Sequence, residues 1–200
     1  MDSYFTLTHE GGSAQFVEKR SRFLAFAHHV ESEEDVKALV TRYRKEYYDA
    51  RHVCFSYILG VEGEHFRAVD DGEPGGSAGK PILGQIRSRD LTDTLVVVVR
   101  YFGGVKLGTG GLAVAYKTAA GDALDNAAVE ERIVKEEMQV ETSYALADTV
   151  MKAARNMGAE IRMDYTADAV VLKLKIRKSE IEKLNERVSH ILCTGDRRDA

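Results

Sequence analysis

Short stretches in which apolar and polar residues alternate predominate in the first part of the chain and predict half-buried strands. The dipeptide Gly11-Gly12 separates the first two stretches and predicts a hairpin there, because glycine readily adopts the positive φ of such turns. The predicted strands lie at residues 3–9, 13–17, the second half of 19–30, 52–59 and 64–69.

Apolar residues at helical spacing predict helices between these strands. They recur in this way from Val36 to Tyr43, and Ser32 before them is a good N-cap, so a helix is expected at about 33–47. The stretch 95–101 is the most apolar of the chain and predicts a central strand. Two further helices are predicted, one at 82–89 opened by Pro81 and a long alanine-rich one at 112–130.

A charged and weakly patterned segment at 131–137 ends this part, and the pattern restarts after it. The order that follows is strand, helix, strand, strand, helix, strand, which is the order of a ferredoxin-like fold. We therefore predict an α+β protein of two domains, residues 1–132 and residues 133–200. The elements of the second domain are predicted at 138–145, 146–157, 159–166, 169–176, 179–190 and 191–196.

Two glycine-rich segments flank the most apolar strand. Four glycines and two prolines fall within the twelve residues 70–81, DDGEPGGSAGKP, and the segment GGVKLGTGG follows at 103–111. Loops of this composition expose backbone N–H groups and allow another molecule to approach closely. The two segments therefore predict a contact surface.

Composition narrows the classes of partner and location. The 200 residues are 44% apolar and carry a formal net charge of -4, so strong non-specific binding to phosphate backbones is not expected. The N-terminal segment is polar, and no apolar run approaches the roughly 18 residues of a membrane span. Two thiols, Cys54 and Cys193, without an export signal indicate a reducing, cytoplasmic setting.

The acidic residues Asp70, Asp71 and Glu73 allow two interpretations. Carboxylates grouped in this way could hold Mg²⁺ or act in acid–base chemistry. They could equally accept hydrogen bonds from backbone N–H groups of the surrounding turns, as Asp commonly does. The sequence leaves both interpretations open.

His52 and Cys54 alternate on one face of a predicted strand, next to Arg51. A nucleophile pair or a zinc site would need further ligands or a base at recognisable spacing, and the sequence offers none. A half-buried strand cysteine is therefore the simpler interpretation.

Cations and aromatic residues border the second glycine-rich segment. Tyr101 and Phe102 lie between Arg100 and Lys106, where an aromatic ring could stack on a base or pack in the core. The glycines at 108–111 lead into a predicted helix, whose N-terminus would favour phosphate or carboxylate. Their spacing matches neither the P-loop nor the dinucleotide fingerprint, so a nucleotide-specific pocket is not predicted.

Two long stretches resemble the signature segments of the YigZ/IMPACT family, DDGEPGGSAGKPIL at 70–83 and VVVVRYFGGVKLGTGGL at 96–112. KRSRFLA at 19–25 and DARHVC at 49–54 resemble two further segments in the same order. The resemblance implies a first domain like the second domain of ribosomal protein S5 and a ferredoxin-like second domain, both similar to parts of elongation factor G. Val114 departs from the Arg that the family commonly has, which weakens the expectation of phosphate at this helix.

The residues and the resemblance together predict a non-enzymatic cytoplasmic protein that binds RNA, the ribosome or a translation factor and regulates translation. No catalytic residue, metal or cofactor is expected. The alternative is a metal-assisted hydrolase or a small anionic ligand-binding protein that uses the acidic loop 70–73 and the glycine loop 108–111, and a protein-interaction module is a third hypothesis. The predicted binding surface comprises Arg51, His52, Asp70, Asp71, Glu73, Lys80, Arg100, Tyr101, Phe102, Gly103, Gly104, Lys106, Gly108 and Gly110.

Overall fold

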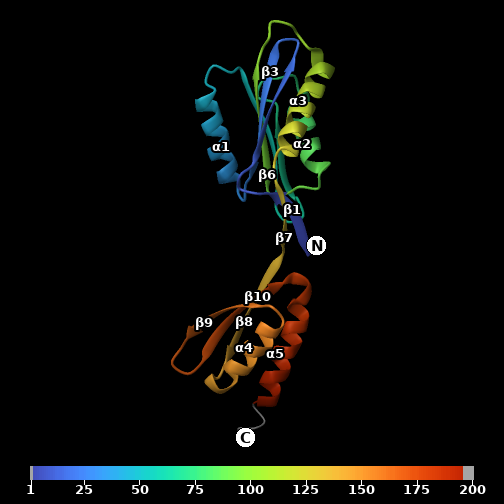
Figure 1. Cartoon of the computed structure of the whole chain (residues 1–200). Coiled ribbons are helices and arrows are strands. Elements are labelled where there is room, and N and C mark those ends of the chain that lie inside the picture. Colours follow the sequence, from blue (N-terminus) through green and yellow to red (C-terminus); the bar gives the residue numbers. More distant parts are fainter. Residues whose placement is uncertain (1, 196–200) are drawn as a thin grey trace. The chain divides into compact units, whose positions relative to one another are not determined.

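The computed structural model describes residues 2–195 and has an α+β fold with antiparallel sheets (Figure 1). The chain divides into two compact units, of which the first ends at Arg132 and the second begins at Ile133. Each unit has a sheet and a hydrophobic core of its own. Within the described range, no helix is both long and apolar enough to cross a membrane.

A five-stranded antiparallel sheet forms the centre of the first unit. Its strand order is β2-β3-β6-β4-β5, so the most apolar strand lies in the middle, as predicted. The residues of β6 alternate between two hydrophobic clusters, which buries both faces of this strand. The strands are β2 (Gly12–Glu18), β3 (Ser21–His29), β4 (His52–Leu59), β5 (His65–Val69) and β6 (Thr94–Tyr101).

Helices cover both faces of this sheet (Figure 1). α1 (Glu33–Glu46) packs on one face, and the Ser32 side chain caps it by accepting the Asp35 N–H, as predicted. α2 (Gly79–Arg87) and α3 (Gly108–Asp125) pack on the other face. The functional residues described below lie on this second face.

The predicted hairpin around Gly11-Gly12 is wrong. β1 (Ser3–Leu7) pairs with β7 (Val129–Ile133) in a separate two-stranded sheet, whereas β2 pairs with β3. The β2–β3 turn consists of Lys19 and Arg20, which both have positive φ, 45° and 67°. A two-residue hairpin turn needs this conformation, which glycine and asparagine adopt most readily. Because Lys19 and Arg20 adopt it here, the usual search for glycine or asparagine does not find this turn.

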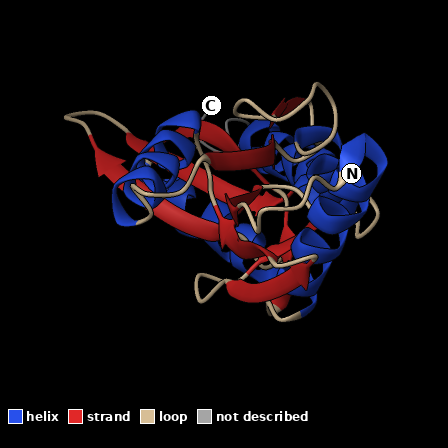
Figure 2. Ribbon diagram, turned by 90° about the horizontal axis from the view of Figure 1, so that it is seen from above, coloured by secondary structure: helices blue, strands red, loops and turns tan. Residues whose placement is uncertain are grey.

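The second unit has a three-stranded antiparallel sheet in the order β8-β10-β9. Two helices contribute to its core, which includes Val150 of α4 and Leu184 of α5. Figure 2 shows helices lying along the strands. The elements are β8 (Lys135–Thr142), α4 (Tyr144–Asn156), β9 (Glu160–Tyr165), β10 (Val170–Arg177), a 3-10 turn (Lys178–Glu180) and α5 (Ile181–Gly195).

Several elements depart from their predicted bounds. α2 begins at Gly79, before Pro81 rather than after it, and β8 spans Lys135–Thr142 rather than 138–145. The expected strand at 191–196 is wrong as far as Gly195, because the apolar residues Leu184, Val188 and Ile191 keep helical spacing and α5 continues through them; residue 196 lies outside the described range. The expected helix at 112–130 begins earlier, at Gly108, and ends at Asp125. The residues that follow alternate in exposure and form β7 instead.

Candidate functional site

The register of the central sheet brings two polar residues together at the edge where β4 begins and β6 ends. His52 of β4 lies opposite Arg100 of β6, and Phe23 of β3 lies opposite Arg100 on its other side. The following residues on this face, Cys54 and Val98, belong to the core beneath α2 and α3. The polar pair therefore lies where the core ends.

A cavity of about 500 Å³ opens at this point. Its wall combines the ends of β4 and β6 with the acidic loop and the start of α3. Several residues of the predicted binding surface line it, namely Arg51, His52, Glu73, Arg100, Phe102, Lys106 and Gly108. Gly72 and Thr109, which belong to the acidic loop 70–73 and the glycine loop 108–111 of the alternative hypothesis, also line it, and Pro74, Leu107 and Leu112, which the sequence did not single out, complete the lining.

Glu73 and Arg100 form a buried ion pair in the cavity wall. The Glu73 Oε1 atom accepts hydrogen bonds from Arg100 Nη1 at 2.6 Å and from the Tyr116 hydroxyl at 2.8 Å. The side chains of Arg100 and Glu73 are 7% and 3% exposed. Arg100 Nε is also buried, and it has no hydrogen-bond partner within the described part of the chain.

Tyr116 links this ion pair to the core. Cys54 Sγ donates to the Tyr116 hydroxyl at 3.3 Å, and the hydroxyl in turn donates to Glu73. Burial, followed by the neighbouring Cys54 and Glu73, raises the pKa of Tyr116 well above its ordinary value, so the hydroxyl stays a neutral donor. Burial likewise raises the pKa of the Cys54 thiol, which makes it a poor nucleophile, in line with the prediction of a buried strand cysteine.

His52 has a defined orientation. Its Nδ1 atom lies 2.8 Å from the Asp71 carbonyl oxygen, which can only accept, so Nδ1 carries a proton. Nε2 lies 4.0 Å from Glu73 Oε1, too far for a hydrogen bond. The side chain is 15% exposed and lines the cavity.

The start of α3 adds positive potential. Leu107 occupies the N-cap position without a side-chain cap, and the first turn holds no acidic residue, so backbone N–H groups are free to bind an anion. Leu107, Gly108 and Thr109 all line the cavity. The exposed cations Arg51 and Lys106 lie in the same lining, whereas the buried carboxylate is paired with Arg100. The cavity therefore favours a negatively charged ligand.

The acidic loop does not gather its carboxylates for a metal, which corrects the magnesium hypothesis. Asp70 accepts hydrogen bonds from the N–H groups of Gly76, Ala78 and Gly79. Asp71 accepts from the Val53 N–H at 2.7 Å and from the Arg44 guanidinium at 2.6 Å. Residues 2–195 contain no group of three His, Cys, Asp or Glu side chains that could hold a metal ion. Asp70 and Asp71 therefore fix the backbone of the loop.

The rest of the predicted surface lies outside the cavity lining. The Tyr101 hydroxyl donates to Asp49 at 2.7 Å. At Gly103 a Cβ atom would lie 2.1 Å from the Arg20 carbonyl carbon, so this glycine permits close packing of the backbone. Lys80 is exposed, and Gly104 and Gly110 have no atom within 4 Å of an added Cβ.

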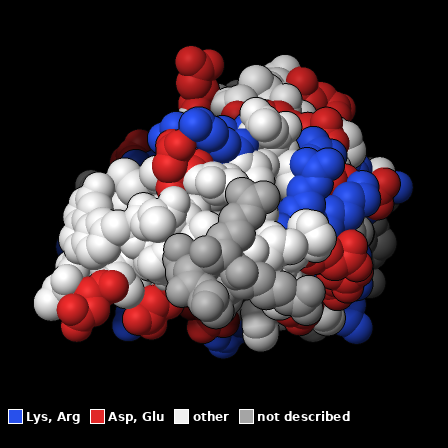
Figure 3. All heavy atoms as spheres, turned by 90° about the horizontal axis from the view of Figure 1, so that it is seen from below, with Lys and Arg blue, Asp and Glu red and all other residues white. Residues whose placement is uncertain are grey.

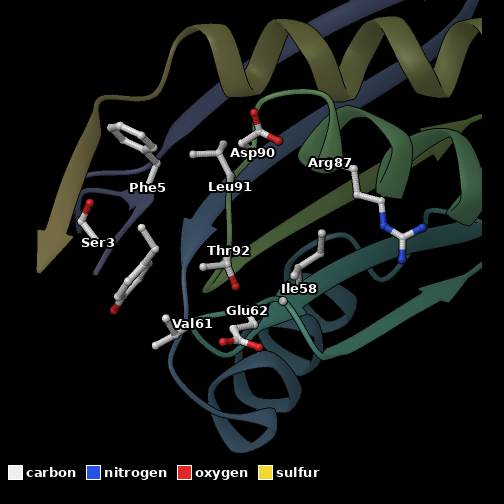
Figure 4. A pocket seen from close by; sticks show the side chains of 11 residues that line it. Ser3, Phe5, Ile58, Val61, Glu62, Arg87, Asp90, Leu91 and Thr92 are labelled. Atoms are coloured by element: carbon white, nitrogen blue, oxygen red, sulfur yellow. The ribbon is translucent and has the colours of Figure 1, made fainter. Parts of the chain in front are cut away.

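A second hollow of about 450 Å³ lies beside β1 and the segment between α2 and β6 (Figure 4). Phe5, Ile58 and Leu91 contribute apolar side chains to it (Figure 4). Its charged lining residues are Arg87, Glu62 and Asp90, so acidic groups outnumber basic ones. The cavity at the start of α3 is therefore the better candidate for an anionic ligand.

Fold and site define an α+β protein of two units with a cationic cavity at the end of its larger sheet. The chain belongs to the IMPACT family: the model of the Impact N-terminal domain matches residues 19–124, more than half of the chain. This confirms the resemblance found in the four sequence segments.

Relatives match beyond that domain. The IMPACT family member YvyE of Bacillus subtilis is 31% identical over 191 residues, which cover 96% of this chain and 88% of the relative. The IMPACT family member YigZ of Escherichia coli is 32% identical over 174 residues, 86% of this chain and 85% of the relative. A crystal structure of a hypothetical protein is similar with a TM-score of 0.74 and 29% identity, covering 95% of this chain and 93% of the other.

Proposed function

We propose that this IMPACT family member is a non-enzymatic binding protein that takes a phosphate group of single-stranded RNA into the cavity at the start of α3. One observation carries the proposal: the uncapped α3 N-terminus, Arg51, Arg100 and Lys106 converge on one cavity. Backbone N–H groups at a helix N-terminus and guanidinium donors are the groups that bind phosphate in many proteins.

One further feature favours RNA over a free anion. Phe102 is 51% exposed in the cavity lining, so one face of its ring can stack on an unpaired base. RNA, the ribosome or a translation factor are the partners implied by the family resemblance, and RNA supplies both the phosphate and the base.

The two units also fit the folds that the resemblance implies. We propose that the first unit is like the second domain of ribosomal protein S5 and that the second is ferredoxin-like, both as in elongation factor G. The connectivity β8-α4-β9-β10-α5 with sheet order β8-β10-β9 supports the second assignment, although its described part lacks the fourth strand. We also propose a cytoplasmic location and a role in regulating translation, and the free thiols of Cys54 and Cys193 support the location.

Fluorescence anisotropy with a labelled single-stranded RNA tests the proposal. The double variant Arg51→Ala/Lys106→Ala should bind about tenfold more weakly, because two phosphate contacts are lost. The control Lys80→Ala/Lys117→Ala removes the same charge from exposed positions outside the cavity lining and should bind like the wild type. Equal weakening by both variants, or no binding by the wild type, would rule the cavity out as the RNA site.

A further inference from the structure

We infer that the cavity distinguishes RNA from DNA, because His52 Nε2 is placed to accept a hydrogen bond from a ribose 2′-hydroxyl. The inference rests on the proposed function and adds the chemical group that the site selects. Two observations support it: a hydrogen bond to Nδ1 fixes the His52 ring, and no protein group of the described chain donates to Nε2.

The His52 ring is held by a part of the chain that is itself fixed. Nδ1 donates to the Asp71 carbonyl at 2.8 Å. Asp71 has a φ of 46°, a strained conformation for a residue with a side chain, and its carboxylate holds that conformation through Val53 N–H and Arg44. In the neutral ring the proton is thereby kept on Nδ1, and Nε2 carries the lone pair. Asp71 acts here as a positioning residue.

The Nε2 atom is open to a donor from outside the protein. It makes no hydrogen bond within the described chain, and the nearest acidic oxygen, Glu73 Oε1, is 4.0 Å away. That oxygen already accepts from Arg100 and Tyr116. A hydroxyl group that enters the cavity can therefore donate to Nε2 and satisfy it.

Within a bound nucleotide, the sugar is the part that suits this position. The phosphate is assigned to the α3 N-terminus with Arg51 and Lys106, and the base to the exposed ring of Phe102. His52 is 15% exposed and its Nε2 lies 4.0 Å from Glu73 of the buried ion pair, and we assign the remaining group, the ribose, to it. The 2′-hydroxyl is the donor by which a protein can tell RNA from DNA.

The test compares three oligonucleotides of one sequence by anisotropy: RNA, DNA and 2′-fluoro RNA, which keeps the sugar pucker of RNA but cannot donate. The wild type should bind RNA about fivefold to tenfold more tightly than the other two, the contribution of one hydrogen bond to a ligand. The variant His52→Asn keeps an amide donor for the Asp71 carbonyl but lacks Nε2. It should lose the preference for RNA and bind DNA as the wild type does.

Each result has one meaning. If the wild type binds RNA, DNA and 2′-fluoro RNA equally, the inference is overturned while the phosphate-binding cavity stands. If His52→Asn keeps the preference for RNA, another group reads the hydroxyl and the inference is likewise overturned. If no oligonucleotide binds the wild type, the proposed function fails and the inference fails with it. Should His52→Asn not fold, the 2′-fluoro comparison on the wild type decides alone.

Discussion

The Glu73–Arg100 pair explains why a charged residue ends the most apolar strand of the chain. Strand β6 carries Arg100 into a position that is 6% exposed, where an unpaired guanidinium would be costly. Glu73, from a loop that precedes α2, supplies the opposite charge, and Tyr116 of α3 adds a hydrogen bond. The pair thus ties the acidic loop and α3 to the sheet.

Removal of one partner should therefore cost much more than removal of a surface ion pair. Glu73→Gln should lower the free energy of unfolding by about 3 kcal/mol, because Arg100 is left buried without a counter-charge. Chemical denaturation measures the change. Adding Arg100→Met to Glu73→Gln should recover part of the loss, so the two changes are not additive.

The matched control is Asp125→Asn. Asp125 pairs with Arg89, and the Asp125 side chain is 64% exposed, so the substitution breaks a surface ion pair. It should cost about 1 kcal/mol or less. Strictly additive effects of Glu73→Gln and Arg100→Met would contradict the account of a coupled buried pair.

At the scale of elements, a residue outside α2 caps the N-terminus of this helix. Its N-cap position is Ala78, which has no side-chain cap, and Asp70 takes over that role from the preceding loop. Burial raises the pKa of Asp70, but the hydrogen bonds from Gly76, Gly79 and Ala78 outweigh it and leave the pKa below the ordinary value of 3.8.

Asp70→Asn should lower the free energy of unfolding by about 1–2 kcal/mol at neutral pH, because the amide loses one of two accepting oxygens. A group with a depressed pKa stabilises the fold fully above its unfolded pKa, and this stabilisation is lost as the pH falls through the folded value. The difference between wild type and variant should therefore shrink below about pH 4. Denaturation at several pH values measures it, with Asp122→Asn, an exposed acid of α3, as the control. A difference that does not change with pH would contradict the cap.

Sequence reasoning found the elements better than their partners. Periodicity located β4, β6 and α1 nearly to the residue, because each buried face of a helix or strand requires apolar residues at the period of that element. The acceptance of backbone N–H groups by Asp70 was one of two interpretations left open, whereas the pairing of Glu73 with Arg100 joins segments 27 residues apart, which periodicity does not encode. The lining residue Leu107 was missed, since the glycines beside it drew attention to a loop where α3 already begins.

At the scale of the whole molecule, charge limits how RNA can be held. The chain has a formal net charge of -4. On the face shown in Figure 3, basic and acidic groups are interspersed among large areas that carry neither. A net negative charge disfavours the binding of long tracts of phosphate backbone, which agrees with binding through one cavity.

RNA binding should accordingly depend only weakly on salt. Contact of one phosphate of a single strand predicts a slope of about -0.7 in a plot of log K against log salt concentration, or a loss of about threefold between 50 and 200 mM salt. Arg51→Ala/Lys106→Ala should flatten the slope, because the released counterions belong to that contact, whereas Lys80→Ala/Lys117→Ala should leave it unchanged. Anisotropy titrations across a salt series measure all three proteins. A wild-type slope steeper than about -4 would require several more phosphate contacts than the cavity has cations, and RNA would then have to lie across a much larger surface.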